Sequence, residues 1–93
     1  MGTKVLEAAR GDLDTAISAL FHAEERLGAA RMAVSREMRT ARQAAGLTLA
    51  QVAARARVSI SYVSDMERGR RDPSVQVCEA LLALLDLRLA SSE

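Results

Sequence analysis

Arginines gather in one part of this 93-residue chain, and their side chains suggest a chemistry. Residues 34–73 hold eight basic and four acidic side chains, whereas residues 1–33 hold four and five and residues 74–93 hold one and three. Guanidinium groups bind phosphate through paired hydrogen bonds. A local positive excess, on a chain whose net charge is only +1, is therefore typical of a nucleic-acid-binding face. An arginine-rich solvated surface is the alternative.

Side chains that could read DNA bases occur in the same segment. A helix is expected from Ser59, as its N-cap, to Arg68, with Val63 and Met66 committed to the interior. The opposite face, which would enter a major groove, carries Ile60, Ser61, Ser64 and Asp65. The carboxylate could accept from a cytosine amino group, the hydroxyls could donate or accept, and the isoleucine could touch a thymine methyl.

A second short helix must position this one. Thr48 precedes apolar residues at helical spacing, so it is expected to cap a helix whose inward face is Val52, Ala53 and Ala56. Ala53 is small enough to let two helices cross closely, and Val58 would fill the corner between them. This spacing predicts a helix-turn-helix over residues 48–71.

From about Val34 to Leu85 the chain resembles the Cro and phage-repressor (XRE-type) helix-turn-helix family. The matching residues are Arg42, Gly46, Thr48, Glu67-Arg68-Gly69 and Pro73-Ser74. The resemblance implies an all-α, lambda-repressor-like domain that binds double-stranded DNA. It further implies a cytoplasmic, homodimeric transcriptional regulator from a bacterium or phage, a repressor that binds an inverted-repeat operator.

The resemblance also assigns roles to single residues. Arg42 would form a structural ion pair with Glu67. Contacts to the DNA backbone would come from Thr48, Arg55, Arg57, Ser59, Tyr62, Arg68, Arg70 and Arg71.

Two positions depart from the family pattern. Leu49 stands where the family usually has a phosphate-binding Gln, so that contact is missing or is supplied by Gln51. Arg57 stands where the family usually has Gly, and a left-handed backbone there would cost about 1 kcal/mol.

Residues 4–34 are predicted to form one long helix that extends the domain. Leucines recur every seven residues, with alanines three residues after each of them, which predicts a coiled-coil seam. The seam leucines are Leu6, Leu13, Leu20 and Leu27. They could face the same helix of a second subunit or the back of this chain's own domain. We favour the first, because so small a body has little else to cover the helix, and we expect any break at Gly28 or Ser35.

The C-terminal part is predicted as a helix that Ser74 caps. Its leucine run is apolar all round, so Leu82 and Leu85 are candidates for a subunit contact. Residues 85–89 alternate between apolar and polar and resemble a short strand that would pair across a dimer through Leu87, with fraying as the alternative. The expected organisation is a dimerisation helix at 1–33, a DNA-binding domain at 34–85 and a tail at 86–93.

Composition argues against several classes. One Cys and one His allow neither an internal disulfide nor a metal cluster, and Cys78 is expected to be a small apolar residue. No stretch suits a signal peptide or a membrane span, and no cofactor or enzymatic activity is expected. One Tyr and one Phe leave no base-stacking platform, which favours duplex DNA. The rival function is an antitoxin or accessory subunit whose N-terminal helix binds a protein partner.

Overall fold

Five helices build the molecule. The computed structural model describes residues 3–22 and 27–91, and the side chains of residues 22–29 lie outside that description. The helices are α1 (Thr3–His22), α2 (Leu27–Ala44), α3 (Leu49–Ala56), α4 (Ile60–Glu67) and α5 (Val75–Ser91). The all-α class is confirmed, since no described residue is in a strand. Among the described helices, none combines the length and the apolar character needed to cross a membrane.

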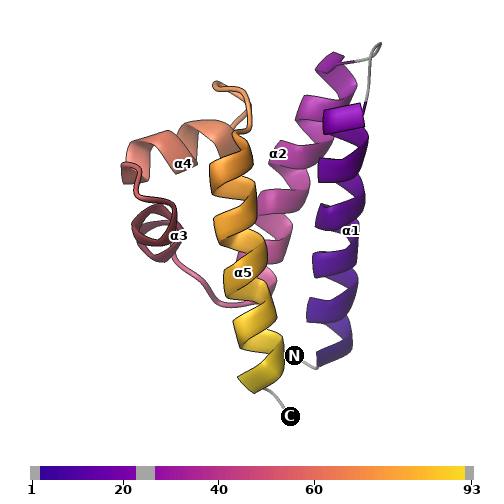
Figure 1. The fold of residues 1–93 in the computed structure, drawn as a ribbon, viewed down its shortest axis with the longest axis vertical. Helices are drawn as coiled ribbons and strands as arrows, with labels where there is room; N and C mark the ends of the chain where they lie inside the picture. Colours follow the sequence, from indigo (N-terminus) through magenta and orange to yellow (C-terminus); the bar gives the residue numbers. More distant parts are fainter. Residues whose placement is uncertain (1–2, 23–26, 92–93) are drawn as a thin grey trace.

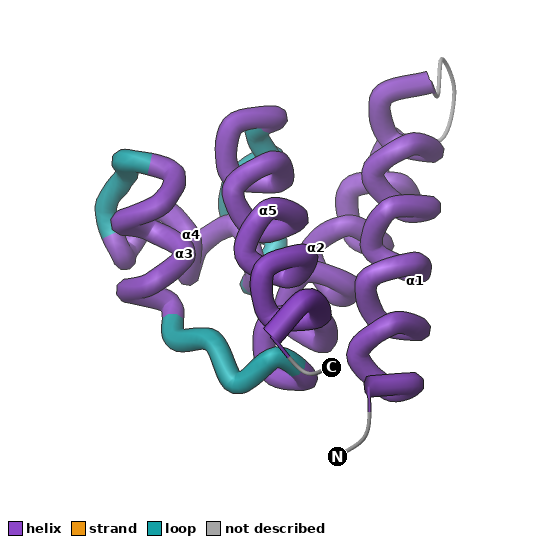
Figure 2. The backbone as a smooth tube through the Cα atoms, turned by 60° about the horizontal axis from the view of Figure 1, so that its bottom comes forward, coloured by secondary structure: helices purple, strands orange, loops and turns teal. Residues whose placement is uncertain are grey.

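The helices are arranged in three layers. Figures 1 and 2 show α2 and α5 in the middle, with α1 on one side and the short pair α3 and α4 on the other. Interhelical contacts agree, because α1 packs on α2 and α5, while α3 packs on α4 and α5. The middle layer therefore joins the N-terminal helix to the helix-turn-helix pair.

The single long helix predicted over residues 4–34 is wrong. The chain forms α1 and then α2, which run in opposite directions side by side (Figure 1). Helix α1 ends at His22 and α2 begins at Leu27, so both positions expected for a break lie inside α2, where Ser35 is a buried residue rather than a cap. Folding back is favourable because it removes the apolar stripe of α1 from water without a second chain.

The seam of α1 is covered by its own chain, which corrects the preference for a partner subunit. Leu6 and Leu20 are 7% exposed and Leu13 is fully buried, and all three belong to the main hydrophobic core. Ala9 and Ala16, also buried, leave room for close approach of the neighbouring helices. The side chain of Leu27, the fourth predicted seam leucine, lies outside the described residues. The heptad pattern identified the buried face correctly but not what covers it.

An ion pair joins α1 to α5. Arg10 Nε donates to Asp86 Oδ1 at 2.9 Å, and Nη2 donates to Asp86 Oδ2 at 3.3 Å. These hydrogen bonds raise the pKa of the Arg10 guanidinium above its ordinary value. Because the Asp86 side chain is 56% exposed, the pair adds only a fraction of a kcal/mol and mainly fixes the register of α1 on α5.

The short terminal strand predicted after Leu85 is also wrong. Helix α5 continues to Ser91, whose hydroxyl donates to the carbonyl oxygen of Leu87 at 2.9 Å. Helical spacing keeps Leu81 and Leu85 on one face, and both are fully buried, so Leu85 is not free for a subunit contact. The expected boundaries at residues 33/34 and 85/86 fall inside α2 and α5.

Candidate nucleic-acid interface

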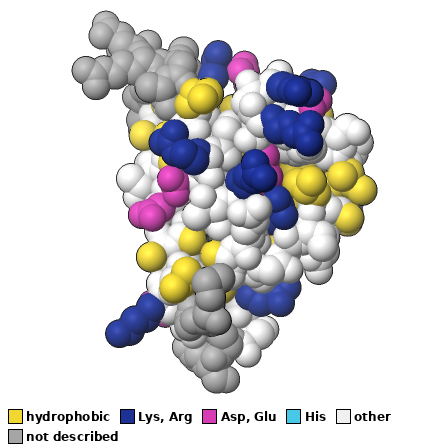
Figure 3. Space-filling view, turned by 180° about the vertical axis from the view of Figure 1, so that it is seen from behind, with side chains coloured by type: hydrophobic (Ala, Val, Ile, Leu, Met, Phe, Trp, Pro, Cys, Tyr) yellow, Lys and Arg dark blue, Asp and Glu magenta, His cyan; other side chains and the backbone are white. Residues whose placement is uncertain are grey.

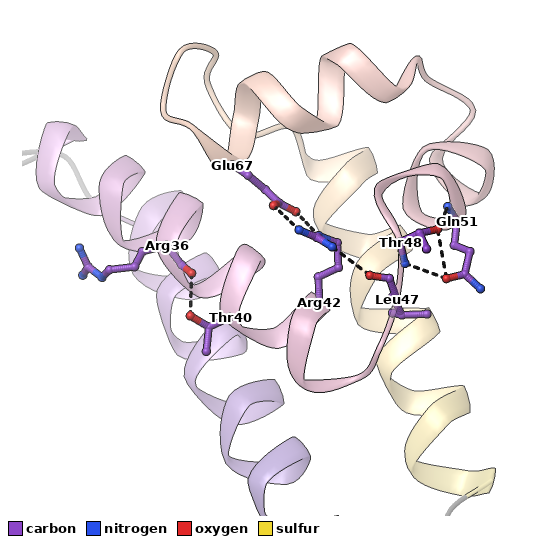
Figure 4. Close-up of polar contacts among 7 residues, drawn as sticks. All are labelled: Arg36, Thr40, Arg42, Leu47, Thr48, Gln51 and Glu67. Atoms are coloured by element: carbon purple, nitrogen blue, oxygen red, sulfur yellow. Dashed lines mark hydrogen bonds and ion pairs between the residues drawn. The ribbon is translucent and has the colours of Figure 1, made fainter. Parts of the chain in front are cut away.

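The connection from α2 to α3 is fixed by a glycine and a capping box. Gly46 adopts a φ of 68°, which ends α2 in the left-handed conformation that glycine tolerates. Thr48 then caps α3, because its Oγ1 accepts from the Gln51 backbone N–H at 3.0 Å. Gln51 Oε1 in turn accepts from the Thr48 backbone N–H at 2.7 Å. The oxygen of the Gln51 side chain is thus committed to the cap (Figure 4).

The turn between α3 and α4 uses a strained residue. Arg57 ends α3 with a φ of 61° and is the single non-glycine residue with positive φ among the described residues. The left-handed backbone, which the sequence left open at this position, is therefore present. Helix α3 packs on α4, Ala53 is buried, and the half-buried Val58 packs against the core.

Helix α4 has one buried and one accessible face. Ser59 caps it as predicted, with Oγ accepting from the Tyr62 backbone N–H at 3.1 Å, and Val63 and Met66 are fully buried. We call the opposite side the reading face, made of Ile60, Ser61, Ser64 and Asp65. Ile60 is 52% exposed and Ser61 is exposed, whereas Ser64 and Asp65 are half-buried. Burial of one side thus leaves the four predicted base-contacting residues accessible together.

The end of α4 is anchored to α2 by the ion pair expected between Arg42 and Glu67 (Figure 4). Arg42 Nε donates to Glu67 Oε2 at 2.7 Å and Nη2 donates to Oε1 at 3.0 Å, while Nη1 donates to the Leu47 carbonyl oxygen at 2.9 Å. The side chains are only 13% and 6% exposed. This bidentate geometry satisfies both charges and fixes the angle of α4 on the body.

The residues predicted to contact the DNA backbone are all accessible to some degree, and their arginines lie in two different settings. Arg68, Arg70 and Arg71 follow α4 directly, and the Arg71 guanidinium lies 4.6 Å from the centre of the Tyr62 ring. Arg55 and Arg57 instead line a groove between α3 and α5, together with Glu79. The arginines thus fall into two groups.

Two arginines of α2 had no predicted role. Arg36 and Arg39 are exposed and line a groove with Arg68, at the end of α4. Seen from behind, most of the visible lysine and arginine side chains lie on the upper half of the molecule (Figure 3). Arg36 and Arg39 are three residues apart on the side of α2 away from its apolar stripe, and this spacing was the sequence signal that could have identified them.

The one thiol takes no part in this surface. Cys78 is 1% exposed inside α5, and burial, with a smaller contribution from Glu79, raises its pKa to about 11. The neutral thiol is a poor nucleophile, so Cys78 acts as a small core residue.

Residues 33–90, more than half of the chain, match the helix-turn-helix domain family. The chain belongs to this family. The match spans α2 from Ala33 onward, the pair α3 and α4, and nearly all of α5, so the geometry described above and the family assignment concern the same residues. Helix α1 lies outside the match and is an addition to the family domain in this chain.

The chain is also similar to proteins that are named as transcriptional regulators. The chain is 42% identical over 60 residues to the transcriptional regulator ClgR of two Mycobacterium tuberculosis strains, covering 64% of this chain and 54% of ClgR. It is 40% identical over 50 residues to the HTH-type transcriptional regulator DdrOP3 of Deinococcus deserti, covering 54% of this chain and 39% of that protein. The chain thus spans about half the length of the relatives it matches, or less. No solved structure matches it.

Proposed function

We propose that this protein is a sequence-specific regulator of transcription that binds double-stranded DNA through the major groove. The observation that carries the proposal is the asymmetry of α4, whose inner side is fully buried while the reading face stays accessible and mostly uncharged. The core does not need a hydroxyl at Ser61 or a half-exposed Ile60. Membership of the helix-turn-helix family and the names of the relatives support the same proposal.

The reading face would discriminate bases through a few weak contacts. Ser61 and Ser64 can donate to or accept from a base edge, Asp65 can accept from a cytosine amino group, and Ile60 can contact a thymine methyl. Because no Arg, Asn or Gln on this face offers a bidentate contact, sequence-dependent DNA shape would supply part of the specificity. Backbone contacts from Arg68, Arg70 and Arg71 would then position α4.

The first test is binding to duplex DNA. Fluorescence anisotropy would be recorded on a duplex from the protein's own promoter region and on a duplex selected from a random pool, each at several salt concentrations. We expect preference for the selected sequence and an affinity that falls steeply with salt, because bound arginines release counterions from the phosphates. An affinity that is independent of both sequence and salt would disprove the proposed function.

We further propose that two copies act as a symmetric repressor on an inverted-repeat operator. One recognition helix reads only a few base pairs, and a dimer places the second about 34 Å away along the duplex. With the α1 seam covered, the subunit contact would involve α5. Leu87 is 55% exposed there, and it lines a groove of about 290 Å³ together with Leu47 and Leu84. Leu82, the other predicted contact, is half-buried.

The dimer contact is tested by Leu87→Asp, with Val5→Asp as the matched control on α1. Both residues are about half exposed, so neither change should prevent folding. Light scattering after size exclusion should give a monomer for Leu87→Asp and a dimer for Val5→Asp and the unchanged protein. If Leu87→Asp is still a dimer, α5 is not the interface. If the unchanged protein is a monomer, the proposal of a homodimer is wrong.

A further inference from the structure

A groove separates the outer side of α2 from the end of α4. It has a volume of about 290 Å³, and its polar lining includes Arg36, Arg39, Thr40 and Gln43 from α2 and Glu67 and Arg68 from the end of α4. We call it the arginine groove. Gly69, with a φ of 74°, turns the chain here. The loop lies against α2, since a Cβ built on Gly69 would be only 3.6 Å from the Sδ atom of Met32.

The arginine groove carries excess positive charge. Arg36, Arg39 and Arg68 are all exposed, and none of them forms an ion pair with a carboxylate of the residues the structure describes. The one carboxylate in the lining, Glu67, is already held by Arg42 through both oxygens. Arg36, Arg39 and Arg68 thus line a groove whose one carboxylate already has its partner, and the groove is large enough for a phosphate group.

Arg36 is free to reach outward. Its side chain points from α2 away from the Arg42–Glu67 pair (Figure 4), and Thr40 Oγ1 donates to the Arg36 carbonyl oxygen at 3.1 Å. That hydrogen bond uses the proton of the threonine hydroxyl within the helix. An anion in the groove would therefore be bound by the charged side chains. Two arginines three residues apart lie on the same side of a helix, so Arg36 and Arg39 can approach one phosphate together.

We infer that the arginine groove binds one backbone phosphate of the DNA beside the bases that α4 would read. This inference rests on the proposed function. Arg68 connects the groove to the proposed DNA-binding surface, because it belongs both to the groove and to the row Arg68, Arg70 and Arg71 that follows α4. Helix α2 therefore serves as a second support on the DNA backbone, in addition to its role in the core.

The test removes the two α2 charges and compares salt dependence. The variant is Arg36→Gln with Arg39→Gln, and the control is Lys4→Glu, which lowers the net charge by the same two units at an exposed position outside the groove. Binding to the selected duplex would be titrated from low to high salt. In the groove variant, the magnitude of the negative slope of log K against log salt should decrease by about 1, as expected for one lost phosphate contact. The control should leave the slope unchanged.

A second measurement locates the phosphate. A set of duplexes would each carry a neutral methylphosphonate in place of one backbone phosphate. At one position per half-site, this replacement should weaken binding of the unchanged protein. It should not weaken binding of the groove variant, which already lacks that phosphate contact. Equal losses for both proteins at every position, with equal salt slopes, would overturn the inference while leaving the proposed function intact. No binding of duplex by the unchanged protein would instead remove the proposed function.

The remaining arm uses inorganic phosphate without DNA. If excess phosphate raises the melting temperature of the unchanged protein but not of the groove variant, while the salt slopes on DNA stay equal, then the groove takes a free anion. That result would also overturn the assignment to DNA. Equal melting temperatures together with the lowered slope would support it.

Discussion

Helices α1 and α4 both bury one apolar side, but they differ in what their opposite sides are available to do. The seam of α1 is packed on α2 and α5, and Arg10 on its flank is paired with Asp86. The reading face of α4 forms no ion pair with any described residue and exposes 52% of an isoleucine. The difference separates stability from binding, and it predicts that changes in the α1 seam alter folding while changes on the reading face alter recognition.

The largest effect is expected in the seam of α1. Leu13→Ala removes a fully buried side chain and should lower the free energy of unfolding by about 4 kcal/mol in urea denaturation. Val5→Ala on the same helix, where the side chain is 47% exposed, should change it by less than about 0.5 kcal/mol. Under conditions where Leu13→Ala is folded, its preference among DNA sequences should be unchanged. An equal loss in both variants would mean that the seam is not buried in solution.

The next effect concerns the anchor of α4. Arg42→Met would leave the Glu67 carboxylate, 6% exposed, without its partner and should cost about 3 kcal/mol in urea denaturation. The double change Arg42→Met with Glu67→Met should recover much of this loss, because no buried charge remains. If the double variant lost the sum of the two single losses, the pair would not be the coupled anchor described above.

A smaller effect is expected on the reading face, and it should appear in binding alone. Ser61→Ala should weaken binding to the selected duplex by about 1 kcal/mol, the usual size of one hydrogen bond, with the free energy of unfolding nearly unchanged. The control is Thr15→Ala, an exposed hydroxyl on α1, which should affect neither quantity. Anisotropy and denaturation on the same samples separate the two outcomes. Unchanged affinity for Ser61→Ala would exclude Ser61 from base reading.

The smallest effect lies at the turn before α4. Arg57→Gly relieves a left-handed backbone worth about 1 kcal/mol but adds flexibility to the unfolded chain, so the net gain in stability should be about 0.5 kcal/mol. Arg55→Gly, two residues earlier inside α3, should instead cost about 1 kcal/mol. In thermal denaturation, the melting temperature should therefore rise for Arg57→Gly and fall for Arg55→Gly. A loss of stability for Arg57→Gly would show that its side chain contributes more than its backbone costs.

Thiol labelling gives an independent measure of the core that α5 completes. With a pKa of about 11, Cys78 is almost entirely protonated at neutral pH, and it is buried as well. It should react with a disulfide reagent only as fast as the chain opens, and faster in Leu13→Ala than in Val5→Ala. Rapid reaction of the native protein would contradict the packing of α5.

Local signals made the helix-turn-helix predictable from sequence. Thr48 and Ser59 accept backbone hydrogen bonds at the two helix starts, Gly46 ends α2, and Val63 and Met66 are buried as their spacing predicted. Each of these depends on residues a few positions apart, because a cap or one turn of helix is a short-range interaction. Short-range signals did not single out Arg36 and Arg39, because the groove that they line with Arg68 brings together residues distant in sequence.

The amino-acid sequence by itself determined which sides of the helices are apolar, where the short helices begin, and which polar side chains α4 leaves accessible. Tertiary structure alone decided that the α1 seam lies on α2 and α5, that residues after Leu85 stay helical, and that Leu85 is in the core. The physical reason is that a heptad or an apolar run specifies a surface to be removed from water, whereas the surface that covers it depends on where the chain reverses direction.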